Sequence, residues 1–121
     1  MGLIVIKLPT ISKEMANQSV VLKFKTGEVD NWGKEEYEKI SIEHCVVQPQ
    51  TIYSGSNNNR QIVANAIVFF YAKITSPMPV LNPKHVGSTL NFEGKDYSIT
   101  QITDNRDPYS NEVWSYELEV L

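Results

Sequence analysis

One stretch constrains the fold of this chain most: residues 60–74, RQIVANAIVFFYAKI, within the longest run that lacks glycine and proline. In a β-strand, successive side chains point to opposite faces. One alternate set here is wholly apolar: Ile62, Ala64, Ala66, Val68, Phe70, Ala72 and Ile74. The other is apolar only in its middle: Gln61, Val63, Asn65, Ile67, Phe69, Tyr71 and Lys73. This pattern predicts a long central strand that is covered on both faces at its centre and exposed to solvent on one face at its ends.

A helix is the alternative for the same fifteen residues. The run holds two valines, three isoleucines and three aromatic residues, whose χ1 angles are restricted in a helix. Its polar residues also do not gather on one helical face. Both observations favour the strand.

Before this stretch, alternation predicts two strands, about seven residues from Ser19 and about residues 37–48, joined by a turn at 26–34 that contains Trp32. In the second strand, alternation separates two sets of side chains: Ile40, Ile42, His44 and Val46 against Ser41, Glu43, Cys45 and Val47. Pro49 is expected to end that strand, because proline cannot donate to a ladder. The polar residues 51–60 then predict a projecting, mobile loop.

After the central stretch, prolines at 77, 79 and 83 predict an extended surface segment. A hairpin follows, with Glu93-Gly94-Lys95 as its turn, and Ile102 breaks the period at a bulge or at the strand's end. The last strand covers 113–121. The sequence therefore predicts an all-β fold, a small antiparallel β-barrel or sandwich of five to seven strands with little helix. We expect a single domain over residues 1–121, with 1–18 as an extended N-terminal arm.

Charge and cysteine content exclude several classes of protein. The net charge of −3 gives no electrostatic support for a nucleic-acid or anionic-membrane partner. One cysteine, Cys45, excludes an intrachain disulfide and a multi-cysteine zinc site. No apolar run approaches the roughly 20 residues of a membrane span. The N-terminal MGLIVIKLP lacks the basic flank and cleavage site of a signal peptide, so we expect a protein of the cell interior without a membrane partner.

Catalytic, metal and cofactor sites find little support. Cys45 and His44 are adjacent, so on a strand they point to opposite faces, which predicts a structural cysteine rather than a catalytic pair. His44 and His85 lack the spacing of a metal site. Residues 104–108 lack the glycine and glutamate of a calcium loop, and 53–56 lack the lysine of a phosphate loop. We predict no enzyme activity, metal or cofactor.

Aromatic residues leave a nucleic-acid-binding alternative open. Five of them are of the kind that stack on bases in a single-strand-binding barrel: Tyr71, Tyr97, Tyr109, Trp114 and Tyr116. They are interleaved with Glu117 and Glu119 rather than with lysine or arginine, which favours packing in the core or between subunits.

From Val46 to the C-terminus, over about 80 residues, the chain resembles the minor capsid protein family of bacteriophages and prophages of Gram-positive hosts. These motifs carry the resemblance as an ensemble, and none of them is catalytic: Pro49-Gln50, Tyr53-Ser54-Gly55, Asn59-Arg60-Gln61-Ile62-Val63-Ala64-Asn65-Ala66, Val86-Gly87-Ser88, Phe92-Glu93-Gly94-Lys95-Asp96-Tyr97-Ser98-Ile99, Asp107-Pro108 and Tyr116-Glu117-Leu118-Glu119-Val120.

The resemblance implies a head-closure, or stopper, protein of the head-tail connector. Such a protein is expected to form a homo-oligomeric ring in the virion at the head-tail junction, to be a monomer in isolation and to lie in the bacterial host cytoplasm before assembly. Its partners would be portal or adaptor ring proteins and tail proteins, and it would contact DNA only as the DNA passes. A tail-completion protein of the same connector is the alternative within this class.

Two sets of residues are candidates for these roles. The first is a channel-facing loop, in which Arg60 is the one charge able to touch phosphate: Tyr53, Ser54, Gly55, Ser56, Asn57, Asn58, Asn59 and Arg60. The second is an arm that exchanges between subunits by adding a strand or burying apolar surface: Leu3, Ile4, Val5, Ile6, Leu8 and Pro9.

Overall fold

The computed structural model describes residues 12–56 and 58–121, and these form a closed antiparallel barrel of six strands. The strands are β1 (Gln18–Val29), β2 (Glu35–Ser54), β3 (Gln61–Tyr71), β4 (Thr89–Phe92), β5 (Lys95–Arg106) and β6 (Val113–Val120). Their order around the barrel is β1-β2-β3-β6-β5-β4, and β4 pairs with β1 to close it. The only helix of the described residues is the single 3-10 turn η1 (Pro83–His85). The predicted all-β class is confirmed.

The central strand forms over Gln61–Tyr71, and its middle alternates as predicted, but residues 72–74, which were also expected in it, form a turn. In β3, Ala64, Ala66, Val68 and Phe70 are buried, whereas the residues between them lie on the outer face and are half-buried or exposed. The apolar set meets matching residues of β6, with Val68 opposite Leu118 and Phe70 opposite Tyr116. The core is completed by the inward side chains of the other strands, chiefly Leu22, Ile42, Leu90, Ile99 and Val120.

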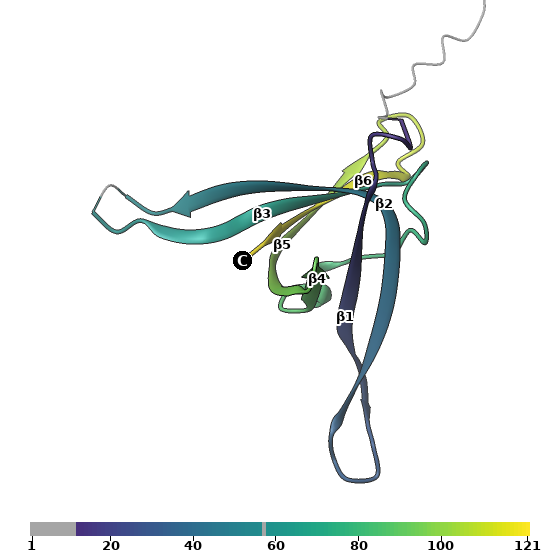
Figure 1. Ribbon diagram of the computed structural model, residues 1–121, viewed down its shortest axis with the longest axis vertical. Helices are drawn as coiled ribbons and strands as arrows, with labels where there is room; N and C mark the ends of the chain where they lie inside the picture. Colours follow the sequence, from purple (N-terminus) through teal and green to yellow (C-terminus); the bar gives the residue numbers. More distant parts are fainter. Residues whose placement is uncertain (1–11, 57) are drawn as a thin grey trace, which may run out of the picture.

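β2 is long and bent, and it takes part in two hairpins. With β1 it forms one projecting hairpin, and with β3 it forms a second that leaves the barrel in another direction (Figure 1). Pro49 therefore does not end the strand, contrary to the prediction. It is paired with Ala66, and the ladder becomes irregular directly after it, a place where strands tolerate proline.

A β-bulge overturns the predicted faces of β2. His44 has a φ of 58°, and the ladder with β1 shifts between the pairs Gln18–Cys45 and Val20–Ile42. Three steps along β2 there match two steps along β1, so the side chains after the bulge change face. Cys45 and Val47 consequently join Ile42 in the core, where alternation had placed them on the opposite side.

Two strands are longer than predicted. β1 continues to Val29, and the turn that follows is closed by Asp30, whose Oδ1 accepts hydrogen bonds of 2.9 Å from the backbone N–H groups of Trp32 and Lys34. β5 continues to Arg106, past an irregularity between Ile99 and Gln101, so the period break marks a bulge rather than the strand's end.

The predicted turn between β4 and β5 is confirmed. Phe92 pairs with Lys95, and the two residues between them, Glu93 and Gly94, both have positive φ, as a tight hairpin turn requires.

The predicted N-terminal arm falls mostly on residues 1–11, which lie outside the described residues, as do Leu3, Ile4, Val5, Ile6, Leu8 and Pro9. Of the remainder, residues 13–15 form a turn, Ala16 is buried and Gln18 begins β1. His44 Nδ1 lies 3.1 Å from the carbonyl oxygen of Ala16 and holds this segment against β2.

Candidate functional site

The predicted channel-facing loop lies at the tip of the β2–β3 hairpin, away from the barrel (Figure 1). Tyr53 and Ser54 belong to the end of β2 rather than to a loop, because they pair with Ile62 and Gln61. The loop is therefore shorter than predicted, and its remaining described residues are exposed. Asn57 lies outside the described residues.

Local contacts hold this tip in shape. Gly55 has a φ of 107°, and a Cβ atom there would collide with the backbone oxygen of Asn59, so only glycine fits. The backbone N–H of Asn59 donates to the carbonyl of Ser56 at 2.9 Å. The Arg60 guanidinium lies 5.8 Å from the centroid of the Tyr53 ring, a cation–π contact at an exposed site. The tip thus presents polar groups and one cation to its surroundings.

The β1–β2 hairpin ends in an exposed tryptophan. Trp32 is 85% exposed, and its turn is fixed by the Asp30 carboxylate. Large exposed aromatic side chains in rigid turns are typical anchors of protein interfaces. Sequence reasoning placed Trp32 in a turn but assigned it no role.

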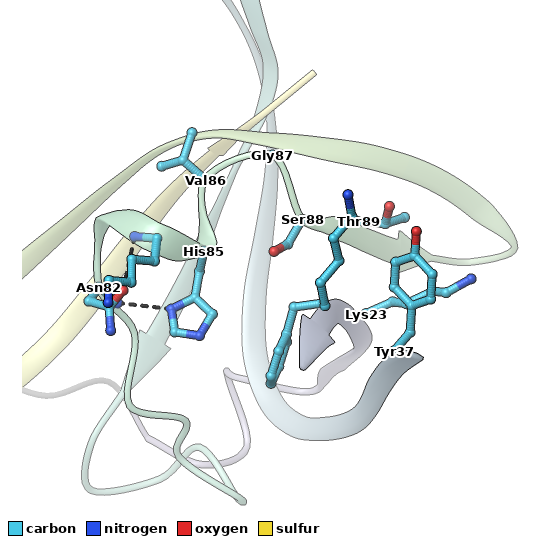
Figure 2. Close-up of a pocket in the computed structure, with 11 residues that line it drawn as sticks. Lys23, Tyr37, Asn82, His85, Val86, Gly87, Ser88 and Thr89 are labelled. Atoms are coloured by element: carbon cyan, nitrogen blue, oxygen red, sulfur yellow. Dashed lines mark hydrogen bonds between the residues drawn. The ribbon is translucent and has the colours of Figure 1, made fainter. Parts of the chain in front are cut away.

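A groove of about 500 Å³ lies between β1, the start of β4 and η1. Figure 2 shows Lys23 and Tyr37 on one side of it and Asn82 and His85 on the other. Three lysines line it, Lys23, Lys25 and Lys84, and no Asp or Glu does. The chain is acidic overall, so this concentration of positive charge differs from the average of its surface. Such a groove suits carboxylate or phosphate groups.

Contacts around the groove fix its walls. His85 Nδ1 accepts a hydrogen bond of 3.1 Å from the Asn82 backbone N–H, and the His85 ring meets Phe24 edge to face at 5.1 Å. Lys23 Nζ lies 4.6 Å from the centroid of the Tyr37 ring. Lys25 pairs with Glu35 at 2.7 Å, and this hydrogen bond and the carboxylate's charge raise the pKa of the lysine.

Sequence reasoning missed this groove. The alternation in β1 did place Lys23 on the outer face, but the closing β1–β4 contact joins residues more than sixty positions apart. No local pattern brings Lys84 to that position.

The residues considered above for metal, calcium and base-stacking sites are not brought together into such sites in the described part of the chain. Among the described residues, no cluster of three or more His, Cys, Asp or Glu side chains could hold a metal ion. Asp104 lies in β5 and pairs with Arg106 rather than forming a calcium loop. The five candidate stacking residues also lack a common surface. Tyr116 is buried and its hydroxyl accepts from the Leu81 N–H, and Tyr71 packs on Trp114. Tyr97 is half-buried in β5 with Lys95 over its ring, and Tyr109 is exposed in a turn. Within the described chain, no helix is long and apolar enough to cross a membrane.

Cys45 is fully buried, and burial raises the pKa of its thiol to about 11. Its Sγ donates to the Gln18 carbonyl at 3.3 Å. We expect a thiol reagent at pH 8 to react with the native protein at least about a hundredfold more slowly than with the urea-unfolded chain, because two pKa units lower the thiolate fraction about a hundredfold. Reaction at equal rates in the two states would contradict this burial.

The same shift makes stability depend on pH. An unfolded thiol titrates near pH 8.5, roughly, so the unfolded chain loses this proton first as the pH rises. Below about pH 8.5 this thiol should not affect the free energy of unfolding. Between that pH and about pH 11 the thiol should lower the free energy of unfolding progressively. Urea titrations at several pH values measure this fall, and Cys45→Ala should reduce it, because Tyr71, whose pKa is also raised, keeps its own contribution at higher pH.

Comparison with known proteins identifies relatives over nearly the whole chain. The sequence profile of a family described as "Minor capsid protein" matches residues 15–120. A protein named "Uncharacterized protein ORF5" from Lactococcus phage LL-H is 40% identical over 119 residues, which cover 95% of this chain and 99% of the relative. A protein of the same name from Lactococcus phage mv4 is 40% identical over 100 residues, 79% of this chain and 87% of the relative.

Proposed function

The chain belongs to the phage minor capsid protein family, and we propose that within the virion it acts as the head-closure protein of the head-tail connector. Membership makes it a non-enzymatic structural component of a virion that interacts with other virion proteins. The finer role is our proposal: a ring of copies at the portal vertex closes the DNA channel after packaging and offers a docking surface to the tail.

One observation carries this proposal: two long hairpins project in different directions from one small closed barrel (Figure 1). In a ring, each hairpin would be repeated around the axis, so one set can reach into the channel and the other can reach a neighbouring ring. A closed barrel leaves no free edge in its body, which suits a subunit that must remain rigid while the hairpins make contacts.

The tips suit these two tasks. The β2–β3 tip is polar, and Arg60 is the one positive charge among its described residues, so it can meet DNA without binding it tightly. The β1–β2 tip carries Trp32, which suits a pocket on an adjoining virion protein. We therefore assign the first to the channel and the second to docking on the portal side or the tail side.

The N-terminal residues Leu3–Pro9 are proposed to exchange between neighbouring copies. Deleting residues 3–9 should weaken ring formation, because each copy would lose the burial of several apolar side chains at about 25 cal/mol per Å². The number of copies per capsid vertex, counted after chemical cross-linking, measures this. Replacement of Lys7 by glutamine is the control and should change little; unchanged ring formation by the deletion variant would remove this role.

A phage with a stop codon in this gene tests the function. Head closure predicts that the mutant fills its heads but releases the DNA, while complete free tails accumulate. Heads that keep their DNA, together with tails that lack their upper end, would instead identify a tail-completion protein.

A further inference from the structure

The basic groove lies opposite a second surface of complementary chemistry. In the closed order β1-β2-β3-β6-β5-β4, β1 is three strands away from β6, and β4 is three strands away from β3. The groove lies between β1, η1 and the start of β4. The outward residues of β3 and β6 therefore lie on the far side of the barrel.

That far side forms what we call the acidic face: Ile67, Phe69, Glu117 and Glu119. Ile67 is the ladder partner of Glu119, and Phe69 is the ladder partner of Glu117. All four side chains are half-buried. Glu117 lies close enough to Tyr71 to reinforce the rise in the tyrosine's pKa that burial causes.

Among the residues that the structure describes, neither Glu117 nor Glu119 takes part in an ion pair. The Glu117 carboxylate accepts a hydrogen bond of 3.3 Å from Asn105 Nδ2. Two like charges beside apolar side chains on one face form a surface that complements positive charge on another surface.

The groove offers that charge. Within the described chain, Lys23 and Lys84 take part in no ion pair, and the exposed pair of Lys25 with Glu35 contributes little and can exchange. The ring of Phe24 and the ring of Tyr37 supply apolar surface beside the lysines. The groove therefore matches both the apolar and the acidic parts of the opposite face.

We propose that the groove of one copy receives the acidic face of the next copy. Two complementary faces on opposite sides of a subunit form a heterologous contact, which repeats in one direction and generates a ring when the rotation closes. This inference rests on the proposed ring and names the contact that builds it. An acidic segment of another virion protein, or a DNA phosphate, would be a different occupant of the groove.

Charge reversal separates these occupants. The variant K23E/K84E reverses the groove, and E117K/E119K reverses the acidic face. Alone, each variant would bring like charges together in every contact and should bind neighbouring copies more than about tenfold more weakly than wild type. Mixed in equal amounts, the two variants form only complementary contacts in alternation, so assembly should return. Copies per vertex on DNA-filled, tailless capsids, counted by cross-linking and mass spectrometry, provide the measurement.

The control is K13E/K73E, which reverses two exposed charges in turns that belong to neither the groove nor the acidic face. It should assemble as wild type does, and all variants should have the same unfolding midpoint. If each reversed variant assembles within about twofold of wild type, the proposed contact between groove and acidic face is wrong. The proposed ring at the connector would not be affected by that result. Failure of the mixture to recover would show that the groove or face binds another protein or DNA, which also overturns the contact. Wild-type protein that never reaches the vertex would overturn both the contact and the proposed function.

Discussion

Replacing Phe70 with alanine is expected to destabilise the protein by about 3–5 kcal/mol. Phe70 is fully buried near the end of β3 and lies opposite Tyr116 of β6, so its loss removes a large side chain from the part of the core where these strands meet. Domains of this size have about 5–15 kcal/mol of total stability. The variant should therefore lose a large fraction of it, measured as a lower midpoint in urea.

Phe69→Ala is the matched control. Phe69 has the same side chain and precedes Phe70 on the same strand, but it is half-buried on the outer face. Its replacement should cost about 1 kcal/mol, the central value for point substitutions. Equal losses at the two positions would contradict the assignment of the inner and outer faces of β3.

Shortening the β2–β3 tip is expected to abolish DNA retention without unfolding the protein. Ser54 and Gln61 are the last ladder pair, so residues 55–60 can be replaced by Asn-Gly, a two-residue turn that suits an antiparallel hairpin. The free energy of unfolding should stay within about 0.5 kcal/mol of wild type, as for most surface changes. Binding to the capsid vertex should also persist, whereas the packaged DNA should escape, which nuclease digestion of released DNA measures.

Arg60→Gln separates charge from bulk at this tip. It keeps the length of the loop but removes the guanidinium that lies over the Tyr53 ring. If the tip blocks the channel sterically, this variant should retain DNA as wild type does. Retention by the shortened variant itself would exclude the β2–β3 tip as the closing element.

The sequence was informative where one local rule acts alone. In β3, strict alternation identifies the buried residues Ala64, Ala66, Val68 and Phe70, because every second side chain of a regular strand faces the core. Glu93-Gly94 predicts the β4–β5 turn for a similar reason, since glycine permits the positive φ that the turn needs.

Prediction failed where the ladder is irregular. Nothing in residues 42–47 indicates that the backbone turns left-handed at His44, yet this single bulge moves Cys45 and Val47 to the core. The bulge is fixed by pairing with β1, about 25 residues away along the chain. Pro49 was misjudged for the same reason, because only its position beside an irregular part of the ladder makes it acceptable in a strand.

The candidate site was predictable in part. The polar composition of residues 53–60 identifies a projecting tip, but its true length depends on where pairing with β3 ends. The lysine groove and the acidic face could not be predicted, since each combines residues that only the closure of the barrel brings together. The resemblance to phage minor capsid proteins, drawn from scattered motifs, is confirmed by relatives that cover nearly the whole chain.

The most direct test of head closure is to add the purified protein to DNA-filled, tailless capsids that carry their portal and to follow both binding and DNA retention. The account predicts that the protein binds at the portal vertex and that DNA leakage stops, with bovine serum albumin as the control that changes neither. Binding to purified tails but not to these capsids would contradict head closure and identify a tail-completion protein. Binding to neither would contradict a role in the connector.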